Sequence, residues 1–162
     1  METFFLCLFA IILIISLLLH VVVIHIFPRI TRLNELDRKA QDTLLCYAKE
    51  ISEGNFGPLQ SKIYRKRLPK DTIGIYNSAT KQIAVDVQKM NRNEYSIFDF
   101  VATAIHEFTH EYQHNVDPKF MKKYDRWNAI VGYDLNPYEL QARRNGRRLT
   151  PKVFEKYFSE MD

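Results

Sequence analysis

The sequence has few cysteines, few glycines and little excess charge, and each shortage argues against a class of protein. Two cysteines in 162 residues, Cys7 and Cys46, are too few for a disulfide-stabilised scaffold. Five glycines argue against a collagen-like repeat, and a hydrophobic share of 46% argues against disorder. A net charge of +4 is too mild to indicate nucleic-acid binding, so no nucleic-acid partner is expected.

Charged residues are also absent from one long apolar stretch, which extends from Phe4 to Ile26. As a helix this stretch would reach roughly 34 Å, enough to cross a hydrocarbon core of about 30 Å. A cleaved signal peptide fits less well, because the stretch is too long, lacks a preceding Lys or Arg and is followed by no small-residue cleavage site. We therefore predict a single-pass membrane anchor over residues 1–28, ended by Pro28 and contacting membrane lipid.

Basic residues gather on one side of this stretch. Four of them follow it: Arg29, Arg32, Arg38 and Lys39. Glu2 is the only charged side chain before it. The positive-inside rule then predicts that a second region, residues 29–162, lies in the cytoplasm. A cytoplasmic location also agrees with a Cys46 that has no partner.

Five segments of residues 29–162 are predicted to be helical, the first two from apolar periodicity and the last two from helix-start signals. They are residues 34–52, 97–115, 119–131, 136–145 and 151–158. Ser96 followed by Asp99 forms a capping-box pattern at the start of the second segment. Gly146 is expected to end the fourth helix, and Pro151 to begin the fifth.

Two β-rich stretches, Thr72–Tyr76 and Gln82–Val87, lie before the second helix. The five residues between them predict a β-hairpin. Residues 59–68 fit no single class of secondary structure, and residues 89–94 indicate a polar connection. We therefore expect an α+β domain with one hairpin and several helices.

The most informative motif is His-Glu-x-x-His at His106, Glu107 and His110. On a helix, the two imidazoles lie one turn apart on one face and can bind a single Zn²⁺. The glutamate, offset by about 100°, can face the open coordination position and accept a proton from water. The apolar residues of the same helix gather on the opposite side: Ile97, Val101, Ala104, Ile105, Phe108 and Tyr112.

A zinc site needs a third protein ligand, and the sequence offers several candidates. Glu139 lies in the first turn of a later helix that can pack beside the zinc helix, although it could instead cap that helix at Asn136. Asp117, just past the zinc helix, remains an alternative. His114 would lie about 12 Å from His106 along the helix axis, which is too far to share one ion.

Two further groups of residues have candidate roles. An oxyanion formed during hydrolysis would need a hydrogen-bond donor, for which Tyr112, Tyr133 and Tyr138 are candidates. The basic run from Arg143 to Arg148 is interpreted as a solvated helix end or as a contact for anionic lipid headgroups.

Four segments resemble a small zinc metallopeptidase of the minimal gluzincin type, a group that includes the ImmA/IrrE-type peptidases. The segments are Gly74–Tyr76, Ile83–Asp86, Phe100–Glu111 and Asn136–Ala142. In such enzymes a β-hairpin precedes the His-Glu-x-x-His helix, and a later helix supplies a glutamate, commonly with an alanine three residues on. The resemblance implies a zincin-like fold and one Zn²⁺ bound by His106, His110 and Glu139. It also implies that Glu107 is the general base.

The leading expectation is a membrane-anchored zinc metalloendopeptidase that hydrolyses a protein or peptide substrate. Peptide deformylase shares the motif, but its cysteine ligand lies in a glycine-rich setting that Cys46 lacks. The alternative from another class is a membrane-tethered binding or assembly module with a vestigial or structural metal site. A structural site would have no use for Glu107 and would need one more protein ligand.

Overall fold

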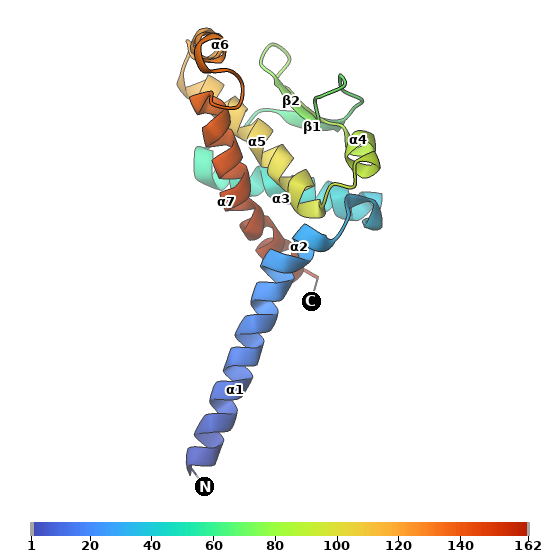
Figure 1. Cartoon of the computed structure of the whole chain (residues 1–162), viewed down its shortest axis with the longest axis vertical. Coiled ribbons are helices and arrows are strands. Elements are labelled where there is room, and N and C mark those ends of the chain that lie inside the picture. Colours follow the sequence, from blue (N-terminus) through green and yellow to red (C-terminus); the bar gives the residue numbers. More distant parts are fainter. Residues whose placement is uncertain (1, 162) are drawn as a thin grey trace.

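A long apolar helix projects from an α+β domain in the computed structural model of the chain, which describes residues 2–161 and the side chains of residues 9–161 (Figure 1). The helix begins as α1 (Glu2–Val21) and continues through a π-helical turn, η1 (Val22–Ile26), into α2 (Phe27–Ile30). Its segment Phe9–Ile30 has a mean hydropathy of 2.9, and 6% of the apolar window is buried. The helix is therefore long and apolar enough to cross a membrane.

Pro28 does not end this helix, contrary to the expectation from sequence. It lies in the first turn of α2, directly after the π-helical turn in which the Phe27 N–H donates to the Val22 carbonyl. A wider turn before a proline relieves the clash between the proline ring and the preceding carbonyl. The helical path consequently continues to Ile30.

The domain contains three short strands and five more helices, besides a 3₁₀ turn, η2 (Leu33–Glu35), in the described residues. They are α3 (Arg38–Phe56), β1 (Lys62–Arg65), β2 (Gly74–Asn77), β3 (Gln82–Val85), α4 (Val87–Arg92), α5 (Ile97–Val116), α6 (Phe120–Val131) and α7 (Pro137–Ser159). Helix α5 lies at the centre, in contact with α3, α7 and the sheet (Figure 1). The α+β class is thereby confirmed.

The three strands form one sheet in the order β1-β3-β2. The predicted hairpin is confirmed, because β2 runs antiparallel to β3 with Ile75 opposite Ala84. Strand β1 lies parallel to β3 on the other side and was not predicted, since polar and apolar residues do not alternate in its sequence, Lys62 to Arg65, and none of its side chains is fully buried. Helix α4 replaces the expected polar connection and is capped by Asp86. Strand β2 is left as an edge strand.

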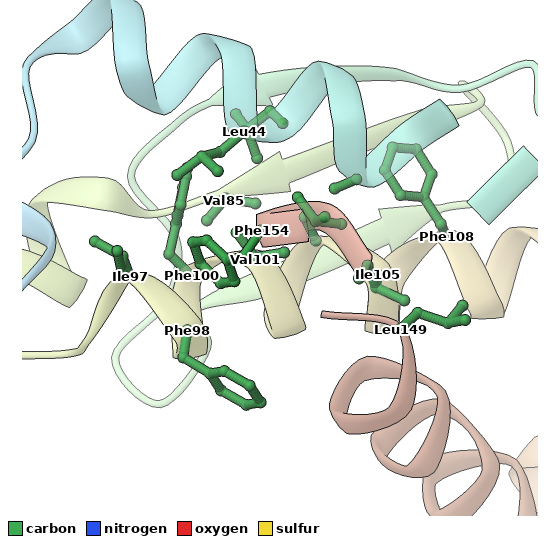
Figure 2. Close-up of a cluster of buried hydrophobic side chains, with 14 of the residues drawn as sticks. Leu44, Val85, Ile97, Phe98, Phe100, Val101, Ile105, Phe108, Leu149 and Phe154 are labelled. Carbon is green, nitrogen blue, oxygen red and sulfur yellow. The ribbon is translucent and has the colours of Figure 1, made fainter. Parts of the chain in front are cut away.

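The hydrophobic core lies between α5, α3, α7 and β3 (Figure 2). Helix α5 supplies more of it than any other element, and the apolar stripe predicted from its periodicity is buried from Ile97 to Phe108. Other elements add further large side chains, among them Leu44 from α3, Val85 from β3, and Leu149 and Phe154 from α7. This packing fixes the position of α5 and leaves its polar face toward β2 and α7.

Helix α7 runs unbroken past Gly146 and Pro151, where two separate helices were predicted. Gly146 is buried against α5, and a Cβ atom there would lie 2.8 Å from the Ala102 carbonyl oxygen. The glycine thus permits close helix crossing and does not end the helix. Near Pro151, the Thr150 hydroxyl donates to the Gly146 carbonyl at 2.7 Å, and Val153 anchors the following turn in the core.

We predict that Gly146→Ala destabilises the domain by about 1–3 kcal/mol, because its methyl group must displace the backbone of α5. Gly54→Ala is the matched control, since a Cβ at this helical glycine meets no atom within 4 Å. It should be neutral or stabilising by up to about 1 kcal/mol. Chemical denaturation of the full-length chain in detergent measures both changes. Equal stability of the two variants would contradict a close contact at Gly146.

Candidate metal centre

The crossing of α5 and α7 brings the predicted ligand residues together. His106 and His110 lie one turn apart on α5, and Glu139 reaches them from the first turn of α7. That turn is fixed by Asn136, whose side-chain oxygen accepts the Tyr138 N–H at 3.1 Å. The Asn136 N–H donates to the Tyr133 carbonyl, so Glu139 is not used as a capping-box acceptor.

The three side chains present their ligand atoms to one another at short range. The two Nε2 atoms of His106 and His110 lie 3.0 Å apart. Each also lies 3.2 Å from one Glu139 oxygen, His106 from Oε2 and His110 from Oε1. Ligand atoms around a tetrahedral zinc at about 2.0–2.1 Å are separated by about 3.3–3.4 Å. The spacing therefore fits three of the four ligand positions around a tetrahedral metal ion.

Burial makes this arrangement costly without a cation. Glu139 is 1% exposed, and its Oε2 accepts no hydrogen bond within the part of the chain that the structure describes. A buried carboxylate oxygen normally has a donor or a metal ion. His106, His110 and Glu139 form the one group of three metal-ligating side chains found among the described residues. Together they could hold a metal ion.

Gln113 orients one of the histidines. The Nδ1 atom of His110 lies 2.8 Å from Gln113 Oε1, so it must donate its proton there. The Gln113 amide group is fixed in turn, because its Nε2 donates to the Tyr138 carbonyl at 3.0 Å and to Gln141 Oε1 at 2.9 Å. This assigns the lone pair of His110 to Nε2, the atom that faces Glu139 and His106.

The carboxylate and the imidazoles of the group shift one another's pKa values. Burial opposes ionisation of Glu139, but the neighbouring imidazoles and the Tyr124 hydroxyl, which donates to Oε1 at 2.6 Å, lower its pKa. Burial alone would lower the pKa of His110, yet the carboxylates of Glu139 and Glu107 raise it. The two shifts share one cause, the attraction between the Glu139 carboxylate and the imidazoles, which favours the charged form of each partner.

Glu107 lies beside the ligand group and lines the same cleft. It is 6% exposed, and burial raises its pKa, although the adjacent imidazoles of His106 and His110 reduce the effect. Its placement depends on Gly74 of β2, where a Cβ would lie 2.8 Å from Glu107 Oε1 and 2.6 Å from the Thr103 methyl carbon. The glycine allows the edge strand to pass directly over the carboxylate.

Residues of α5, β2, α6 and α7 line the cleft around the ligand group. Helix α5 contributes Thr103, His106 and His110 to it, β2 contributes Gly74 to Tyr76, and α7 contributes Glu139. Helix α6 closes the end nearest the histidines, where Phe120 lies 6.2 Å from the His110 ring. The ligand group is therefore reached from an open groove between β2 and α7.

Other residues considered from sequence lie away from the ligand group. Asp117 accepts hydrogen bonds from the Lys119 N–H and from Lys123, so it is engaged outside the cleft. His114 contacts a different residue, with its Nδ1 atom 3.2 Å from the Tyr76 hydroxyl. It does not join the ligand group, as its distance from His106 along the helix predicts. The structure thus brings Glu139 to the histidines, and not Asp117.

The three candidate tyrosines have different surroundings. Tyr133 lines the cleft, and burial together with the Glu139 carboxylate raises its pKa. Tyr112 stacks on Phe56 with ring centroids 5.1 Å apart, and Tyr138 packs edge-to-face against Phe120. Neither of the latter two is among the residues that line the cleft.

Two residues of the site were missed from sequence. Gln113 follows His110 by three positions, a spacing that brings side chains together on a helix and could have indicated it. Tyr124 contacts Glu139 because α6 packs against the first turn of α7, and no local sequence pattern predicts that contact. Comparison with family models, curated proteins and solved structures finds no match for the chain.

We predict that the purified chain binds one metal ion and that Glu139→Ala sharply lowers its occupancy. Asp117→Ala is the matched control, because it removes a carboxylate that accepts from the Lys119 N–H and from Lys123, away from the ligand group. Metal content by mass spectrometry after dialysis measures both. Full occupancy in Glu139→Ala would contradict the ligand set.

Gln113→Leu should weaken metal binding by about 10–100-fold, because His110 loses the acceptor that fixes its tautomer. Gln60→Leu makes the same change at an exposed glutamine outside the site and should leave affinity unaltered. Competition with a chromogenic chelator gives both affinities. Equal affinities would show that Gln113 does not orient the ligand.

Proposed function

We propose that the chain is a zinc-dependent metallopeptidase with a zincin-like domain, anchored to a membrane by its N-terminal helix. The observation that carries the proposal is the placement of Glu107. A buried carboxylate lies in the cleft beside a His-His-Glu group, where a purely structural metal site would have no use for it.

The ligand group supports zinc in particular. Two imidazoles and one carboxylate are a donor set that zinc uses in catalytic sites, with a fourth position left for water or substrate. Within the described residues no fourth His, Cys, Asp or Glu joins the group, which agrees with an open site. A zinc ion bound there would polarise the scissile carbonyl and activate a water molecule for attack.

Glu107 acts as the general base in this proposal. It directly follows His106 in the helical turn between the two histidines, and Gly74 and Thr103 hold its carboxylate at the floor of the cleft. From there it accepts a proton from the attacking water and transfers it to the leaving amine. Tyr133, which lines the cleft near Glu139, is the candidate donor to the oxyanion, whereas the Tyr124 hydroxyl donates to Glu139 itself.

The edge of β2 supports a peptide as the substrate. One side of β2 pairs with β3, whereas the residues from Gly74 to Tyr76 line the cleft on the other side. An extended peptide can add to such an edge through main-chain hydrogen bonds. This binding would lay a scissile peptide bond across the cleft between Glu107 and the ligand group.

The N-terminal helix supports anchoring in a membrane. Its apolar side chains from Phe9 to Leu19 are largely exposed, which is costly in water and favourable in lipid. The basic residues after it favour a cytoplasmic domain, as the positive-inside rule predicts. Access to cytoplasmic proteins or to the cytoplasmic ends of membrane proteins follows from that location.

Glu107→Gln should retain the metal ion and lower peptide hydrolysis by at least about 100-fold, because the general base is removed without loss of a ligand. Glu155→Gln, at an exposed position of α7, is the matched control and should leave hydrolysis unchanged. Each variant is incubated with denatured proteins as substrates, and mass spectrometry of the resulting digest measures cleavage. The metal content of each variant is measured in parallel. Retained turnover in Glu107→Gln would exclude the role assigned to it.

A further inference from the structure

A row of arginines on α7 extends from the metal cleft into a second hollow. Four arginines form this row, which we call the arginine wall: Arg143, Arg144, Arg147 and Arg148. Arg143 and Arg147 line both the metal cleft and the second hollow. They follow Glu139 at intervals of four residues, so all three side chains lie on one face of the helix.

Most of the positive charge in this wall has no partner. Arg143 is neutralised, because it pairs with Asp134 at 3.0 Å and stacks near the Tyr133 ring. Arg144, Arg147 and Arg148 are exposed and make no ion pair or hydrogen bond with any side chain that the structure describes. Arg147 is thus an uncompensated cation at the rim of the metal cleft.

The wall lies far from the end of α7 that meets the N-terminal helix. At that end, Phe158 packs against Phe27 of α2 with ring centroids 6.0 Å apart. Arg147 precedes Phe158 on α7 by three helical turns, about 16 Å along the axis. Arg147 therefore lies about midway along α7, removed from the contact with α2, and it lines the metal cleft. This position favours a ligand that enters the cleft over a lipid headgroup.

We infer that Arg147 selects substrates with an acidic side chain three or four residues from the cleaved bond, an inference that rests on the proposed peptidase function. Arg147 follows Glu139 by two turns, about 12 Å along α7. An extended peptide advances about 3.3 Å per residue, so three or four residues span that distance. An arginine recognises a carboxylate through two parallel hydrogen bonds, and Arg144 and Arg148 would attract further acidic residues.

The test uses the full-length zinc-loaded chain in neutral lipid nanodiscs. The substrate probe is a mixture of unstructured dodecapeptides that carry Glu, Gln or Lys at each position, and mass spectrometry reads the cleavage sites. The variants are Arg147→Gln and Arg147→Glu, with Arg92→Gln as the matched control at an exposed arginine of α4. Metal content shows that each variant is folded.

The expected result is a preference for Glu over Gln on one side of the cleaved bond, centred three or four residues away. Arg147→Gln should reduce this preference by about three- to fivefold, as expected for a partly exposed ion pair. Arg147→Glu should reverse it in favour of Lys, whereas Arg92→Gln should leave it unchanged. Cleavage without an acidic preference, or with one that Arg147→Glu leaves intact, would overturn the inference while the peptidase proposal stands.

A binding measurement separates failure of the inference from failure of the proposed function. Fluorescence anisotropy compares Glu-rich and Lys-rich dodecapeptides on the same chains, whether or not cleavage occurs. Tighter binding of the Glu-rich peptide, lost in Arg147→Glu, supports the acidic subsite even if no bond is cleaved. Equal binding of both peptides overturns it. Binding of phosphatidylserine vesicles that depends on Arg147, without peptide discrimination, would assign the wall to lipid and also overturn it.

Discussion

The close approach of α5 and α7 at Gly146 is the constraint on which the rest of the site depends. A glycine hydrogen faces the Ala102 carbonyl where any larger residue would require the helices to separate. One turn from this contact along α5 lies His106, and two turns back along α7 lies Glu139. The separation of the helices at one buried point therefore sets whether the carboxylate meets the two imidazoles at 3.2 Å. A shift of even 1 Å at the crossing would open the ligand group.

A second glycine, Gly74, sets the position of Glu107 beside the ligand group. Gly74 lets β2 pass over Glu107, so this carboxylate is buried under the strand whose free edge lines the cleft. Two carboxylates, Glu107 and Glu139, thus lie close together with little exposure to water. Mutual repulsion and desolvation make such a pair unfavourable unless a cation shares the site. Polar contacts from Gln113 to His110 and from Tyr124 to Glu139 then fix the direction of these two side chains, which is a feature of metal centres in proteins.

Much of this arrangement could be predicted from sequence, because it rests on local periodicity. The helix that bears His106 and His110 follows from its capping box and apolar stripe, and the hairpin follows from its turn. Gly146 and Pro151 misled the prediction, since a glycine needed for helix crossing looks the same as one that ends a helix. The contact of Tyr124 with Glu139 depends on how α6 folds back over α7, a tertiary relation that no local pattern encodes.

Zinc K-edge X-ray absorption of the zinc-loaded full-length chain tests the central claim most directly, because it reports the ligands and the open position together. The account predicts four light-atom ligands at about 2.0–2.1 Å, of which two are imidazoles and one is water. Addition of a hydroxamate should replace the water and change the spectrum. A sulfur ligand, or a spectrum that no added ligand alters, would indicate a closed structural site and would contradict the account.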